Sequence, residues 1–166
     1  MISPELMTVV QNEFALDWDG LHGLYHWQRV REIGLRLARL TGANPTVVEL
    51  FAFLHDAKRA NNHRDPEHGA RAAEFARSLQ GSLIRLSDRE FERLAFACRY
   101  HTNGLTEAHV TVQTCWDSDR LDLGRIGMTP DPRYLCTSAA REPEMIEWAM
   151  LQCQPWIESR RQKGPT

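Results

Sequence analysis

The sequence is poor in lysine. Only Lys58 and Lys163 are lysines, and the other members of the 20 basic residues are arginines. Arginine makes two-pronged contacts with phosphate and carboxylate groups, which a lysine ammonium cannot match. The composition therefore favours local arginine contacts with an anion, although a bias of the genome towards arginine would look the same.

Cysteines are few and isolated. None of the four belongs to a CxxC pair, which excludes a zinc ribbon and a thioredoxin-like motif. We expect four buried, reduced thiols, at Cys98, Cys115, Cys136 and Cys153.

Long apolar runs, a secretory signal and a dominant charge are all absent. No run approaches the length of a membrane span, and the N-terminus lacks a basic start followed by an apolar stretch. The 20 basic residues nearly balance 22 acidic ones, so no broad basic surface is available for a long nucleic acid or a membrane. These absences favour a cytoplasmic protein with a small-molecule partner, and a homodimer stays an option.

Helical periodicity recurs along the chain, without strand alternation or an internal repeat. We predict one all-α domain over residues 1–166, a bundle of six to eight helices that hides roughly 70% of its unfolded surface. The polar tail begins near residue 160. The expected helices cover 4–15, 21–40, 45–59, a segment opening at 65, 87–101, 106–123 and 143–159.

Several residues mark where these helices begin and end. Gly42 stops the second helix, whose buried stripe includes Leu40, and Asn44-Pro45 opens the third. Asp65 is the expected cap before His68. Ser87 and Glu90 form a capping box.

The dipeptide His55-Asp56 follows the apolar run 47–54. Two polar side chains within an apolar helix are costly to bury unless something binds them, and a metal ion is the simplest candidate. Four further candidates are His26, His68, His101 and Asp119. Together with His55-Asp56, they follow the order H, HD, H, H, D along the chain.

Histidine nitrogen and carboxylate oxygen suit zinc, manganese, iron, cobalt or nickel. His26 and Asp119 can complete a four-ligand set with His55 and Asp56. A second ion would then take His68 and His101, with Asp56 bridging the two.

Three local patterns in this order resemble the HD superfamily of metal-dependent phosphohydrolases: residues 26–30 (HWQRV), 55–59 (HDAKR) and 117–122 (DSDRLD). The resemblance implies an HD-like helical bundle. It also implies that the family's metal ligands are His26, His55, Asp56 and Asp119, with the Asp-Arg-Leu frame selecting Asp119. His68 and His101 are similar to the extra ligands of dinuclear branches. Thr102 stands where some branches have an adjacent histidine, so the sequence is compatible with either one or two bound ions.

A divalent ion supplies hydroxide at neutral pH, so the leading hypothesis is hydrolysis of a small phosphorylated substrate, most plausibly a nucleotide. The bond would be a phosphomonoester, phosphodiester or pyrophosphate. The expected catalytic residues are Asp56, Lys58, Arg59 and Asp119. The expected substrate-binding residues are Lys58, Arg59, Arg64, His68, His101 and Arg120.

Two other functions share this pattern. The H, HD, H, H, D order also occurs in di-iron oxygenases of the superfamily, and a non-catalytic nucleotide-binding module would keep the fold without turnover. Arg29, Arg71 and Arg120 could instead pair with surface acids.

The remaining polar and aromatic residues have expected roles in structure or at the surface. Asp117 is an expected hydrogen-bond acceptor behind the ligands, and Asp122 an expected solvated or salt-bridged acid. We expect His22 in a turn, and His63 and His109 on the surface. Core packing is favoured over ring stacking for most of the aromatic candidates, which are Trp18, Tyr25, Trp27, Tyr100 and Trp116.

Overall fold

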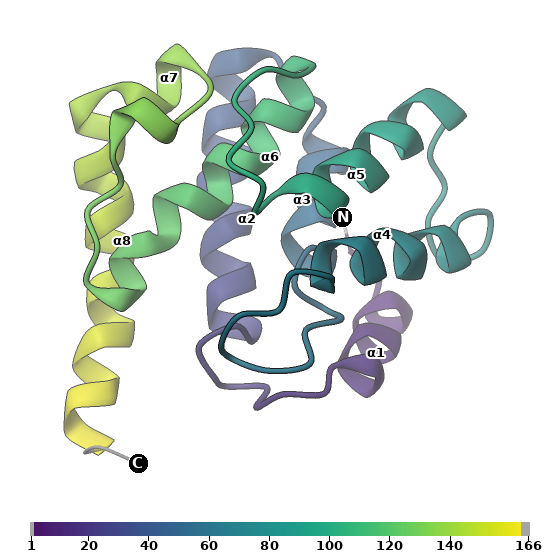
Figure 1. Ribbon diagram of the computed structural model, residues 1–166, viewed down its shortest axis with the longest axis horizontal. Helices are drawn as coiled ribbons and strands as arrows, with labels where there is room; N and C mark the ends of the chain where they lie inside the picture. Colours follow the sequence, from purple (N-terminus) through teal and green to yellow (C-terminus); the bar gives the residue numbers. More distant parts are fainter. Residues whose placement is uncertain (1, 164–166) are drawn as a thin grey trace.

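The chain folds into helices joined by short loops, as a computed structural model of residues 2–163 shows (Figure 1). Within those residues there are eight α-helices and no β-strand, so the all-α prediction is confirmed. The α-helices are α1 (Pro4–Glu13), α2 (Leu24–Thr41), α3 (Pro45–Leu54), α4 (His68–Leu79), α5 (Asp88–Tyr100), α6 (Val110–Arg120), α7 (Ser138–Arg141) and α8 (Pro143–Lys163). Two 3-10 helices complete the fold, η1 (Leu121–Ile126) and η2 (Pro132–Tyr134).

The expected end of α2 and the expected starts of α3 and α5 are confirmed. Gly42 ends α2 in the left-handed conformation at φ 75°, which costs glycine little. The side chain of Asn44 accepts hydrogen bonds from the first amides of α3, and Pro45 is its first residue. Ser87 and Glu90 form the capping box of α5. Short-range chemistry therefore sets these three boundaries.

Helix α3 is shorter than predicted, because it ends at Leu54 rather than near Arg59. His55 caps it, and Asp56 lies in the turn that follows. The amide of Ala57 donates to Leu54 O, and the amide of Arg59 donates to Asp56 O, which are the tighter i→i−3 bonds of a 3-10 turn. The histidine-aspartate pair therefore stands at a helix end, not inside a helix.

Other boundaries also differ from expectation, since α1 ends at Glu13 rather than at 15 and α2 begins at Leu24 rather than at 21. Helix α4 begins at His68, not at Asp65, whose carboxylate accepts from Ala60 N and Arg71 instead. Helix α6 begins at Val110 and continues into η1. Helix α8 runs to Lys163, beyond the expected end at 159, while residues 164–166 of the expected tail lie outside the described residues.

Helix α2 is shared by two apolar clusters. Trp27 and Val30 belong to the larger cluster, with side chains from α1, α3, α4, α5 and α6. Ile33 and Leu37 belong to a smaller cluster against η1, α7 and α8. Leu40 was expected on the same stripe but is 63% exposed, because it lies in the last turn beyond the packed neighbours.

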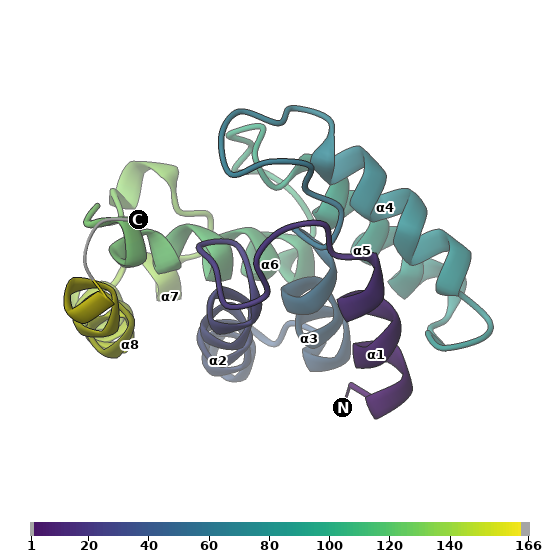
Figure 2. The same cartoon turned by 90° about the horizontal axis from the view of Figure 1, so that it is seen from below.

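Helices α2, α3 and α6 lie side by side in the centre of the molecule, with α4 and α5 on one side and α7 and α8 on the other (Figures 1 and 2). The four cysteines are free and buried, as predicted. Within residues 2–163, no helix is both long and apolar enough to cross a bilayer.

Candidate metal centre

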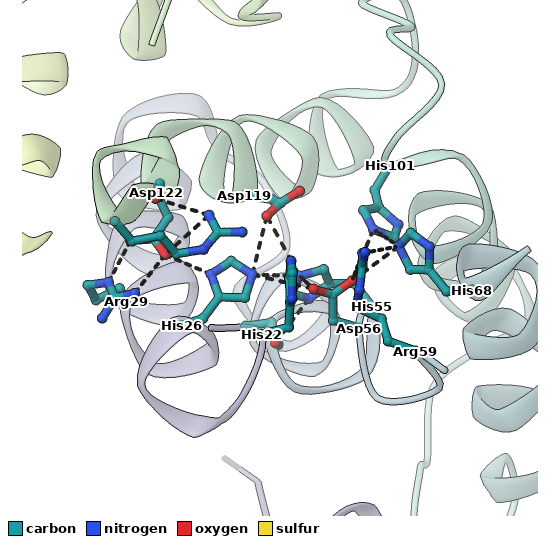
Figure 3. Close-up of polar contacts among 12 residues, drawn as sticks. His22, His26, Arg29, His55, Asp56, Arg59, His68, His101, Asp119 and Asp122 are labelled. Atoms are coloured by element: carbon teal, nitrogen blue, oxygen red, sulfur yellow. Dashed lines mark hydrogen bonds and ion pairs between the residues drawn. The ribbon is translucent and has the colours of Figure 1, made fainter. Parts of the chain in front are cut away.

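The six predicted metal ligands converge on one buried cluster (Figure 3). They come from five helices: the first turn of α2, the end of α3 and its following turn, the start of α4, the end of α5 and the end of α6. These residues are His26, His55, Asp56, His68, His101 and Asp119.

Each of the four histidines is held by its Nδ1 atom. His55 Nδ1 donates to Phe51 O and Ala52 O at 3.1 Å, and His101 Nδ1 donates to Cys98 O at 2.7 Å. His68 Nδ1 bonds to a carbonyl in the same way, that of Asp65. His26 Nδ1 lies 2.7 Å from a carboxylate oxygen of Asp122. Because these partners accept the Nδ1 proton, a ring in its neutral form presents a bare Nε2 lone pair, as metal-binding histidines do.

The bare nitrogens face one another in pairs. His26 Nε2 lies 3.2 Å from His55 Nε2, and His68 Nε2 lies 2.9 Å from His101 Nε2. Two lone pairs at such distances repel unless a cation or a proton lies between them. Ligands 2.0–2.1 Å from a tetrahedral zinc are about 3.3 Å apart, so this spacing fits a shared ion.

Asp56 lies between the two pairs. Its Oδ2 is 3.8 Å from both His26 Nε2 and His55 Nε2, while its Oδ1 is 3.1 Å from His68 Nε2 and 3.5 Å from His101 Nε2. Asp119 Oδ1 adds an oxygen 3.4 Å from His26 Nε2 and 3.7 Å from His55 Nε2. His26, His55, Asp56 and Asp119 thus form a first group of four ligands. His68, His101 and Asp56 form a second group of three. The two groups share the carboxylate of Asp56.

Mutual charge interactions keep the cluster ready for a cation. Burial lowers the pKa of His55 to about 3, so the ring stays neutral. Burial alone would raise the pKa of Asp56, but His55, His101 and His68 hold it well below its usual value. The histidines around Asp119 lower its pKa in the same way, against the effect of burial. Both carboxylates are therefore ionised, as metal ligands must be.

The second group already has a cation beside it. Arg59 Nη1 lies 3.4 Å from Asp56 Oδ1 and 3.2 Å from His68 Nε2, and Arg59 also donates to the carbonyls of Asn61 and His63. A guanidinium at this position competes with an ion for the same lone pairs. An ion in the second group would therefore be held more weakly than one in the first.

Asp122 is a salt-bridged acid, one of the two roles expected for it, and it also lies behind a ligand, which was the role expected for Asp117. Asp122 is fully buried, not solvated, and orients His26 while it accepts from Arg29 at 2.6 and 3.0 Å. Asp117 instead accepts from Cys136 N, Thr137 N and Thr137 Oγ1, and so anchors the loop before α7. The prediction of Asp117 as the acceptor behind the ligands was wrong, because sequence spacing does not show which face of α6 meets α2.

Arg29 was missed as a residue of the site. Its position one turn after His26 on α2 is a signal that sequence reasoning can use, because residues three apart share a helix face. The prediction that Arg29 pairs with an acid holds, but the pair is buried rather than exposed.

Three of the predicted substrate-binding cations are engaged by other groups or are exposed. Lys58 Nζ pairs with Glu13 of α1 at 2.8 Å, and Arg64 is exposed on the loop before α4. Arg120 donates to Tyr134 O and Leu105 O, both at 2.7 Å, so it joins two loops. Arg59 is the predicted cation that contacts the cluster directly.

A pocket of about 620 Å³ opens beside the ligands His101 and Asp119. Asp119 is the most accessible ligand, with 18% of its side chain exposed. The pocket wall also contains cations and apolar or aromatic side chains, namely Arg120, Arg125, Leu123, Met128, Pro130, Tyr134 and Leu135. A small molecule in this pocket would reach the cluster.

The other histidines and aromatic residues lie largely as expected. His22 lies in a turn, where its Nδ1 contacts Asn62 Oδ1 at 3.0 Å, and His63 and His109 are exposed. Trp27 and Trp116 are core residues without exposed surface. The rest of the aromatic candidates are partly or largely exposed, and they are Trp18, Tyr25 and Tyr100.

Comparison with solved structures identifies the fold. A protein described as a predicted HD superfamily hydrolase, from an uncultured Thermotogales bacterium, matches 96% of this chain with 91% of its own, at a TM-score of 0.69 and 24% identity. A protein from Lactobacillus plantarum matches 98% of this chain with 98% of its own, at a TM-score of 0.56 and 18% identity. No protein-family model and no curated protein matches the chain. The chain has the HD-domain fold, as its sequence motifs predict.

Proposed function

We propose that the protein is a metal-dependent phosphohydrolase of the HD type, acting on a small phosphorylated molecule such as a nucleotide. The observation that carries this proposal is the convergence of four Nε2 atoms and two ionised carboxylates beside an open pocket. Its support from comparison is the solved HD-fold neighbour, which is itself described as a predicted hydrolase.

The residues of the cluster divide the work. His26, His55, Asp56 and Asp119 would hold a first divalent ion, and His68 and His101 with Asp56 would hold a second, weaker one. Such an ion, when bound, lowers the pKa of water to about 7 and neutralises charge on phosphate. Asp56 and Asp119 keep their negative charge, and the neutral ring of His55 keeps its Nε2 bare. Zinc, manganese, iron, cobalt and nickel all suit this donor set.

The pocket favours a small substrate over a polymer. Its volume of about 620 Å³ falls in the range of ordinary ligand sites. The balanced total charge argues against binding along a nucleic acid. A phosphate would lie towards Asp119 and His101, and the rest of the substrate against the apolar wall.

The decisive experiment measures metal content and phosphate release together. Protein purified without added metal is analysed for its elements and then assayed against a panel of nucleotides and other phosphate esters. We expect bound transition metal and release of phosphate. D56A should lose both, because Asp56 contributes an oxygen to each group, whereas D19A removes an exposed acid and should lose neither. Normal metal content and turnover in D56A would refute the proposal.

The dinuclear arrangement also suits a second candidate, a di-iron oxygenase, because Asp56 directs one oxygen to each histidine pair. Iron as the bound metal, with a visible absorption band that changes in air, would favour the oxygenase. Colourless protein that releases phosphate favours the hydrolase. Saturable nucleotide binding without any product would favour a non-catalytic module.

A further inference from the structure

Arg125 carries a buried guanidinium without enough partners. It lies in η1, three residues after Asp122, and only 7% of its side chain is exposed. Its Nε is buried and has no hydrogen-bond partner within residues 2–163. A buried polar donor of this kind normally has an acceptor, so an unfilled one points to a missing ligand.

The charges around Arg125 do not balance. Among the described residues, Asp122 is the carboxylate within ion-pair distance of both Arg29 and Arg125. Arg29 donates two hydrogen bonds, of 2.6 and 3.0 Å, to the carboxylate of Asp122. Arg125 Nη1 lies 3.6 Å from Asp122 Oδ2 and donates to the backbone oxygen of Asp122. Two guanidinium groups thus share one carboxylate. A buried cation without its own anion is costly, which favours binding of an anion beside it.

Arg125 is the better placed of the two arginines that line the pocket. Arg120 already directs two of its nitrogens to backbone oxygens of Tyr134 and Leu105. Arg125 shares the same pocket wall with the ligands His101 and Asp119, and its contacts leave donors free.

We propose that Arg125 binds a phosphoryl oxygen of the substrate in the pocket beside Asp119 and His101. This inference rests on the proposed function, which supplies the phosphorylated substrate. Met128 and Tyr134, which are 53% and 61% exposed, belong to the apolar part of the wall. The substrate class is therefore a phosphorylated molecule whose other end is a flat apolar or heteroaromatic group.

Arg125 also borders a second hollow, of about 550 Å³, between η1 and α8. Arg160 lines that hollow but does not line the pocket beside the ligands. An anion bound there would depend on Arg160 as much as on Arg125. The pair of variants R125M and R160M therefore tells the two locations apart.

The test is titration of inorganic phosphate into the purified protein, by calorimetry, with and without its metal. We expect R125M to lower phosphate affinity about tenfold or more, the value of a charged hydrogen bond. R125K should recover part of the loss, because it keeps the charge and loses the planar fork. R160M and R133M should bind phosphate as the parent does, since Arg133 is 82% exposed and pairs with Asp131. Metal content and thermal midpoint are measured for every variant.

Parent-like phosphate affinity in R125M, at unchanged metal content, would overturn the inference. So would an equal loss in R160M, which would place the anion in the hollow by α8. Because phosphate binding needs no turnover, the two proposals fail separately. If phosphate binding depends on Arg125 but no substrate is hydrolysed, only the proposed function is refuted. If R125M hydrolyses the substrate with the same kcat/KM as the parent, only the role assigned to Arg125 is refuted.

Discussion

Single atoms decide which histidines can bind metal. The structure shows Nδ1 of His26, His55, His68 and His101 tied to an acceptor, so each ring is fixed in one tautomer and one orientation. Such ties raise ligand basicity and remove the entropy of ring rotation before a metal arrives. The cluster is therefore prepared for an ion by the residues behind it.

Asp122 and Asp117 provide a matched test of this preparation. D122N weakens the acceptor behind His26, so we expect metal affinity to fall roughly 10- to 100-fold. D117N is equally buried but removes a loop anchor, so it should lower the thermal midpoint and keep metal affinity. Competition with a fluorescent chelator measures the affinity. Equal metal affinity in the parent and D122N would contradict the role of Asp122.

Substitution of His101 tests how many ions the cluster binds. We expect titration with manganese to show one tight and one weaker site, because Arg59 competes at the second group. H101A should remove the weaker site and keep the tight one, and H26A should remove the tight one. Electron paramagnetic resonance of free manganese counts the bound ions. A single class of site in the parent, or two classes in H101A, would show that the second group is not a metal site.

At the scale of elements, close packing of α4 on α5 brings His68 to His101. A Cβ added at Gly69 would lie 2.7 Å from the backbone oxygens of Cys98 and Arg99, closer than real contacts allow. The missing side chain is therefore what lets the two helices approach. His68 is the residue before this contact and His101 follows Arg99 by two, so the pair depends on the approach.

G69A should separate α4 from α5. We expect a loss of about 1–3 kcal/mol of unfolding free energy from overpacking, together with loss of the weaker ion and retention of the tight one. A70G is the control, because it changes helix propensity by about 1 kcal/mol at the next position without touching the contact. Urea denaturation and manganese titration give both readouts. Two intact metal sites in G69A would contradict this account of the packing.

At the scale of the whole molecule, burial of His55 and His22 makes the metal-free protein sensitive to acid. Burial lowers the pKa of His55 to about 3, from about 6.5 in an unfolded chain, and lowers that of His22 as well. Between these values the unfolded chain binds a proton that the folded chain excludes. The stability that neutral His55 contributes is thus present above pH 6.5 and is lost progressively as pH falls towards 3.

We therefore expect His55 alone to lower the unfolding free energy of chelator-treated protein by about 2 kcal/mol from pH 6.5 to 5. His101 acts in the opposite sense, because burial would lower its pKa but the contacts with Asp56 raise it in the folded chain. H55Q removes the main titrating group and should flatten this dependence, although His22 keeps part of it. Urea denaturation at several pH values measures the slope. An equally steep slope in H55Q would show that His55 is not the group responsible.

Much of this protein was predictable from short-range patterns in the chain. Helix caps at Asn44 and Ser87, the stop at Gly42 and the ligand candidates all follow from local chemistry, because a cap or a histidine-aspartate pair is recognisable within a few residues. The family motifs carried the fold class, which the solved HD-fold neighbour matches.

Only the tertiary structure decided how those residues meet. The end of α3 at Leu54, the contact of Asp122 rather than Asp117 with His26, and the pairing of Lys58 with Glu13 all depend on partners far along the chain. The sequence indicates which side chains could bind a metal. Which of their lone pairs face one another depends on how five helix ends pack. Packing depends on many distant contacts at once, so local spacing cannot report it.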